Sequence, residues 1–111
     1  MKYFVTNGER EGTCYHEFYR GKWDSKTFWN DDSIYLHDDV LLENRGFADA
    51  LLLVVPNYDP YRDTEVSSED WARVGKAIRQ DDRGSLELYD EAGAWLEEVF
   101  KTEDCFTILG I

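Results

Sequence analysis

Polar and apolar residues alternate along parts of the first forty positions, which is typical of short β-strands. Residues 13–19 show this best, because Cys14, His16 and Phe18 would lie on one face of a strand and positions 13, 15, 17 and 19 on the other. Residues 3–6 have a similar β-prone composition and are followed by an Asn-Gly pair. We therefore expect residues 3–6 and 13–19 to pair with each other as a hairpin.

Two further segments are predicted to be strands, and two others are ambiguous. Residues 33–37 are flanked by Asp pairs, and residues 105–111 are β-prone and strongly apolar. An apolar end of this kind belongs inside a sheet rather than at its edge. Residues 23–29 fit either a strand or an aromatic-lined loop, and residues 40–44 fit either a strand or a helix.

Residues 47–55 carry apolar side chains at helical spacing. These side chains are Phe47, Ala50, Leu51, Val54 and Val55. Residues 51–55 taken alone also fit a buried strand. We favour a helix that ends before Pro56, because a residue that precedes proline avoids helical geometry. Residues 57–63 are dense in turn formers, so we expect a loop there.

Two more helices are predicted in the C-terminal half. The first begins at Ser67-Ser68, where a capping hydroxyl precedes the carboxylates of Glu69 and Asp70. Its buried stripe consists of Trp71, Val74 and Ile78. Ser85 is the expected cap of the second helix. The apolar stripe of that helix consists of Leu88, Ala92, Trp95, Leu96 and Val99.

The order of these elements indicates an α+β fold. We expect one domain over residues 1–111, built as an antiparallel β-sheet with two or three helices packed on one face. A chain of this length suits a single compact domain that buries roughly two thirds of the surface exposed when it is unfolded.

Charge narrows the possible partners of this domain. The chain has 24 acidic and 12 basic side chains, and residues 31–70 alone hold −9 of the net charge of −12. Such a charge repels phosphate backbones and anionic lipid, which disfavours direct binding to nucleic acid or to a membrane surface. No apolar run approaches the ~18 residues of a membrane span, and residues 1–7 lack the features of a signal peptide. We therefore expect a cytoplasmic protein.

The motifs of common catalytic sites are missing from the sequence. It contains no Gly-x-x-x-x-Gly-Lys-Ser/Thr phosphate loop, no Gly-x-Gly-x-x-Gly and no Gly-x-Ser-x-Gly. The two cysteines, Cys14 and Cys105, are expected to be reduced thiols, and with His16 and His37 they form only a weak metal pattern. We expect no enzymatic activity, no cofactor and no metal site. A dedicated calcium site, or a glycosidase with two tuned carboxylates, stays as a minor alternative.

The acidic segment predicts a binding surface for a basic protein. Opposite charges steer association, and desolvated tyrosines or tryptophans supply affinity. Plain solubility is the competing explanation for the charge, and packing of the loop tyrosines against the domain is the competing explanation for the aromatics. The candidate anchors are Tyr58 and Tyr61. The candidate acidic partner-binding residues are Asp31, Asp32, Asp38, Asp39, Asp59, Asp63 and Glu65.

The C-terminal half resembles a known class of small acidic proteins. The segments 71–78 and 89–100, followed by 106–111, are similar to the helix–helix–strand endings of bacterial immunity proteins of contact-dependent inhibition and related polymorphic toxin systems. The similarity covers roughly the last 45 residues, and it differs from the barstar type because no Tyr-Gly-x-Asn-Leu segment is present.

The resemblance implies a non-enzymatic cytoplasmic inhibitor of one cognate toxin, most often a nuclease. Its partner would be a basic toxin domain, whose active-site surface the acidic face covers. The alternative is an acidic DNA mimic that inhibits a host restriction or defence protein. A small metal- or sugar-dependent enzyme is a third possibility, which a buried carboxylate pair in an enclosed pocket would favour.

Overall fold

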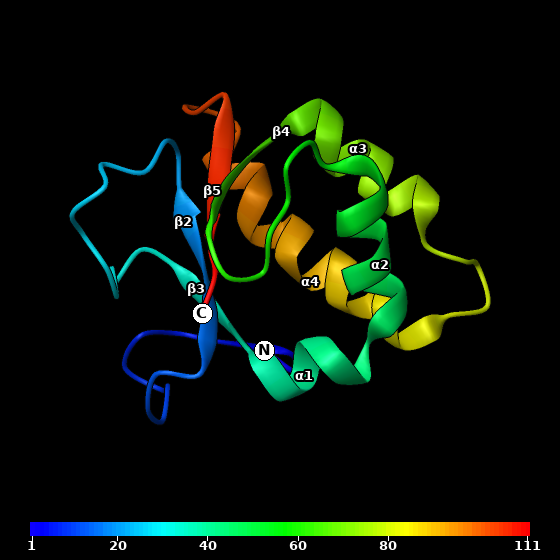
Figure 1. Ribbon diagram of the computed structural model, residues 1–111, viewed down its shortest axis with the longest axis horizontal. Helices are drawn as coiled ribbons and strands as arrows, with labels where there is room; N and C mark the ends of the chain where they lie inside the picture. Colours follow the sequence, from blue (N-terminus) through cyan, green and yellow to red (C-terminus); the bar gives the residue numbers. More distant parts are fainter.

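The computed structural model describes residues 1–111 and contains one antiparallel five-stranded sheet with four helices packed against it. The strand order is β1-β3-β2-β5-β4. The strands are β1 (Phe4–Val5), β2 (Tyr15–Arg20), β3 (Ile34–His37), β4 (Asp63–Ser67) and β5 (Cys105–Leu109). The helices are α1 (Asp38–Glu43), α2 (Arg45–Val54), α3 (Ser68–Ala77) and α4 (Arg83–Val99). Figure 1 shows the helices on one side of the sheet, as the α+β prediction requires.

The predicted hairpin between the first two strands is wrong. Strand β1 pairs with β3 instead, and β3 also pairs with β2, so that Leu36 lies opposite Phe4 on one side and His16 on the other. Three consecutive residues of β3, from Ile34 to Leu36, are buried. Burial on both faces is typical of an interior strand, and β3 occupies such a position between β1 and β2.

The last strand lies inside the sheet, as expected for an apolar segment. Strand β5 pairs with β2 and with β4. Strand β4 was missed, because Asp63 was assigned to the loop, Ser67 to the cap of the next helix, and residues 64–66 to no element. Beyond β5, the backbone N–H groups of Gly110 and Ile111 donate to the carbonyl oxygens of Arg62 and Pro60, both at 3.0 Å. The end of the chain therefore holds the loop that precedes β4.

The two ambiguous segments adopt different structures. Residues 40–44 belong mostly to helix α1, which is capped by the ring Nδ1 of His37 accepting from the N–H of Asp39. Residues 23–29 form a loop, in which the Asp24 carboxylate accepts two backbone N–H groups and a hydroxyl. These three bonds lower the pKa of Asp24 to about 2.

The three predicted helices are confirmed. Helix α2 ends at Val54, before the proline, and α3 begins with a capping box between Ser67 and Asp70. The predicted cap of the last helix is wrong, since Asp82 caps α4 by accepting from the N–H of Ser85. The Ser85 hydroxyl is buried and accepts from the N–H of Phe47 at 3.0 Å, which joins α4 to α2.

The main core lies between the sheet and the helices. It comprises 19 buried residues, among them Phe18 and Phe106, whose ring centroids are 5.3 Å apart. No helix is long and apolar enough to cross a membrane.

The opposite face of the sheet is covered by the loop between β2 and β3, drawn in light blue and cyan in Figure 1. There the ring of Trp29 stacks on Tyr35, and the guanidinium group of Arg10 lies 3.9 Å from the centroid of Trp29.

Candidate functional site

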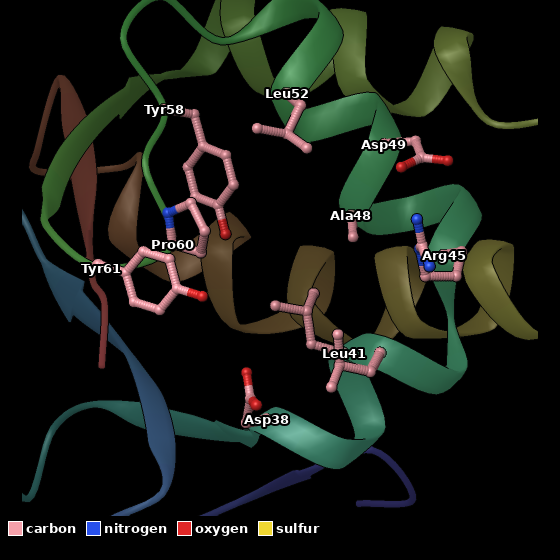
Figure 2. Close-up of a pocket in the computed structure, with 10 residues that line it drawn as sticks. Asp38, Leu41, Arg45, Ala48, Asp49, Leu52, Tyr58, Pro60 and Tyr61 are labelled. Atoms are coloured by element: carbon pink, nitrogen blue, oxygen red, sulfur yellow. The ribbon is translucent and has the colours of Figure 1, made fainter.

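The candidate site is an open groove of about 330 Å³ between helices α1 and α2 and the loop that precedes β4. We call it the Tyr–Leu groove. Its lining residues are Asp38, Leu41, Leu42, Arg45, Ala48, Asp49, Leu52, Tyr58, Pro60 and Tyr61. In Figure 2 the loop residues form one wall and the helix residues the other, while the carboxylate of Asp38 points into the space between them.

The helical wall exposes leucines because α2 buries only one of its faces. Phe47, Ala50 and Leu51 point into the core, which places Leu52 and Leu53 on the outer side of the helix. The side chain of Leu53 is 77% exposed, and that of Leu52 is also more than half exposed. Leu52 lines the groove together with Leu42 of α1, which is also more than half exposed, so the helical wall presents apolar side chains to water.

The loop wall carries the two tyrosines. The Asp59 carboxylate accepts the N–H of Tyr61 at 2.9 Å, and this bond shapes the turn. Tyr61 is 76% exposed, whereas Tyr58 packs against the core. Burial, helped by the charges of Asp38 and Asp59, raises the pKa of Tyr58 to about 12, so its phenol is neutral at physiological pH. The wall therefore combines one fixed aromatic ring with one exposed ring.

The floor of the groove is a carboxylate that contacts a buried histidine. Asp38 Oδ1 lies 2.8 Å from Nε2 of His16, whose side chain is 1% exposed. Burial lowers the pKa of His16 from 6.5, and this effect exceeds the opposing influence of Asp38. The imidazole is therefore neutral at pH 7 and donates its Nε2 proton, because a carboxylate can only accept. The pair carries one net negative charge.

Basic side chains do little to neutralise the groove. Arg45 lies at its far end and forms no ion pair within 4.0 Å, and neither Asp38 nor Asp49 has a lysine or arginine partner at that distance. Arg62 lies 3.8 Å from Asp59 on the loop, but the arginine is highly exposed. Exposed pairs of this kind contribute little and are screened by salt. The groove is therefore acidic as well as apolar.

The predicted site residues lie in three places. Asp38, Tyr58 and Tyr61 line the groove, and Asp39 and Asp59 are their sequence neighbours. Asp31 and Asp32 lie elsewhere, around a shallow hollow that also contains Glu91 and Trp95. Asp63 and Glu65 lie on β4, and both are exposed. The structure thus brings three of the nine predicted residues to the groove, places two beside them in the sequence, and puts the other four elsewhere.

Sequence reasoning missed the leucines and the histidine of this site. Leu52 falls outside the apolar stripe that identified α2, and a leucine outside the buried stripe of a helix is the signal that could have placed it on the surface. No comparable signal existed for His16, because its contact with Asp38 follows from the pairing of β2 with β3. Its earlier interpretation as a residue on one strand face is consistent with its burial.

Other side chains with possible chemistry are placed as follows. Cys14 and Cys105 are both free thiols. No group of three or more His, Cys, Asp or Glu side chains is arranged to hold a metal ion. Glu17 is the one buried carboxylate, and it accepts hydrogen bonds from the N–H groups of Trp29 and Asn30 and from the hydroxyl of Ser33.

The fold and the groove together describe a small acidic α+β protein with an exposed apolar and acidic surface. Comparison of the chain with protein-family models, with curated proteins and with solved structures finds no match.

Proposed function

We propose that this chain is an immunity protein, a non-enzymatic cytoplasmic inhibitor that binds one cognate toxin through the Tyr–Leu groove and its rim. The target is a basic toxin domain, and nucleases are the class that fits best because their active sites attract phosphate. The observation that supports the proposal is the combination of exposed leucines, the exposed Tyr61 and carboxylates around one hollow.

Each part of this surface has a separate role in the proposed binding. Unpaired carboxylates attract a basic partner and raise its association rate by a factor of ~10–10³, which favours an inhibitor that must act before damage occurs. Exposed apolar side chains, such as Leu53 and Tyr61, provide the area that is desolvated in the complex and so slow its dissociation. A carboxylate face laid over a phosphate-binding surface would block substrate entry.

The experiment first asks whether a basic toxin domain is encoded beside the gene of this chain, and then measures inhibition and binding kinetics with that domain. The groove variant is Asp38→Asn with Asp39→Asn, which removes one charge from the groove and one from its rim; it should associate about tenfold more slowly and show a flatter dependence on salt. The variant Tyr61→Ala should associate at the normal rate and dissociate faster. A matched control, Asp90→Asn with Asp104→Asn, removes the same charge from exposed positions outside the groove.

Two results would contradict the proposal. The first is a toxin whose activity is unaffected by an excess of this chain. The second is an equal loss of association rate in the groove variant and in the control variant, which would leave the groove without a special role. Inhibition of a restriction or defence enzyme, with no effect on a toxin, would support the DNA-mimic alternative instead.

A further inference from the structure

We propose that the floor of the Tyr–Leu groove receives a single arginine side chain of the partner, with the guanidinium group on Asp38 and its stem between the tyrosine and leucine walls. This inference rests on the proposed function, because it names the chemistry by which the toxin is recognised. It is nevertheless testable without the toxin.

The first step is the state of Asp38. Its side chain is 29% exposed, and only Oδ1 accepts a hydrogen bond from this chain. The second carboxylate oxygen is therefore available to a ligand, and Figure 2 shows the carboxylate directed into the groove. A partly buried carboxylate with one free oxygen is a strong acceptor for a charged N–H donor.

The second step is the lack of an internal counter-ion. The histidine behind Asp38 is held neutral by burial, and His37, the other ring nearby, opposes its protonation further. Arg45 lines the same groove but lies more than 4.0 Å from any carboxylate oxygen. Asp38 therefore has no lysine or arginine partner of this chain that an arriving cation would have to displace.

The third step distinguishes arginine from lysine. Tyr58 and Tyr61 present rings on one wall, and a guanidinium group can stack on an aromatic face while it donates to a carboxylate. An ammonium group is a compact, strongly hydrated charge and uses such walls less well. The opposite wall, with Leu42 and Leu52, suits the three methylene groups of an arginine stem and an apolar neighbour.

The fourth step concerns which molecule supplies the arginine. A second copy of this chain is disfavoured, because each copy carries a net charge of −12 and the groove lies in the most acidic part of the sequence. Two such surfaces repel each other at distances within a Debye length of ~8–10 Å. A basic foreign protein meets no such barrier.

The test uses a short peptide as the probe. The peptide acetyl-Leu-Arg-Leu-amide is titrated into the isotope-labelled protein, and amide chemical shifts are followed by NMR. We expect the shifts to cluster on α1, on α2 and on the loop of residues 57–62. The same peptide with citrulline in place of arginine keeps the shape but lacks the charge, and it should bind at least about tenfold more weakly.

Two variants make the test specific to Asp38. The variant Asp38→Asn removes the charge but keeps an oxygen that can accept the Nε2 proton of His16, so the fold should be preserved. The matched control is Asp39→Asn, which removes the same charge from a neighbouring side chain that is 77% exposed and does not line the groove. The first variant should weaken the peptide at least about tenfold and the second less than about twofold.

The inference is overturned if both variants weaken the peptide equally, if citrulline binds as well as arginine, or if the shifts lie outside the groove. Concentration-dependent dimers in sedimentation, with shifts in the same residues, would also overturn it. The two proposals fail separately. A toxin that binds the Asp38→Asn variant normally refutes the arginine site alone, and a peptide bound as expected by a chain that inhibits no toxin refutes the immunity function alone.

Discussion

Replacing Glu17 by alanine should destabilise the protein and release the loop that covers the outer face of the sheet. The Glu17 carboxylate is 2% exposed. It accepts the backbone N–H of Trp29 at 2.8 Å, the N–H of Asn30 at 3.1 Å and the hydroxyl of Ser33 at 2.6 Å. The Tyr35 hydroxyl lies 3.2 Å from the same carboxylate, but donates its proton over a shorter distance to the carbonyl oxygen of Asn30.

The size of the effect follows from the three donors that lose their acceptor. A hydrogen bond to a charged group contributes ~1.5–3 kcal/mol, and a buried donor left without a partner costs ~1–3 kcal/mol. Trp29 and Asn30 are half-buried residues, so water replaces the lost acceptor there more readily than at the buried Ser33. Removing a buried charge also recovers part of its desolvation cost. We therefore expect a loss of about 3 kcal/mol, which is a large part of the ~5–15 kcal/mol of a typical domain.

Urea denaturation and hydrogen exchange measure this prediction. The free energy of unfolding should fall by about 3 kcal/mol, and the amides of Trp29 and Asn30 should exchange faster than those of β5. Glu65→Ala is the control, because it removes an exposed carboxylate from the same face of the sheet and should change stability by less than ~0.5 kcal/mol. A loss below ~1 kcal/mol for Glu17→Ala would refute the reasoning.

Three further predictions concern the chain end, the buried histidine and the exposed leucines. Gly110→Ala should cost about 1–3 kcal/mol in a urea denaturation, because its Cβ would collide with the carbonyl oxygen of Pro60 and break the bonds that hold the loop. Unchanged stability would contradict this. For His16, whose pKa burial lowers from 6.5, the unfolded chain binds a proton that the folded chain does not. The stabilisation that the neutral His16 provides is therefore at its full value above pH 6.5. It decreases as the pH falls below 6.5 and is lost below the pKa that His16 has in the folded state. The denaturation midpoint should therefore change more between pH 7.5 and pH 5 in the wild type than in His16→Gln. An equal change in both proteins would be evidence against a lowered pKa of His16. Leu53→Ala should leave the unfolding free energy within ~0.5 kcal/mol but weaken toxin binding in a surface-plasmon measurement, and a stability loss well above that value would mean that the side chain is buried.

The helices of this protein were predictable because the information for a helix is local. The apolar spacing of Trp71 and Val74, together with the capping pair Ser67 and Asp70, determines α3 within one short stretch of chain. Helix α2 was recognisable for the same reason, and the proline after it marked its end. The acidic and aromatic character of residues 31–70 is also a property of composition alone.

Only the tertiary structure decided how the strands are ordered and which side chains meet. Strand β3 lies between β1 and β2, a pairing of backbone groups between segments far apart in the chain. Those pairings bring His16 to Asp38 and place Tyr58 opposite the leucines of α2, while Asp31 and Glu65 lie elsewhere. The net charge is encoded in the sequence, but its distribution over the surface depends on contacts between residues far apart in the chain, which local patterns do not contain.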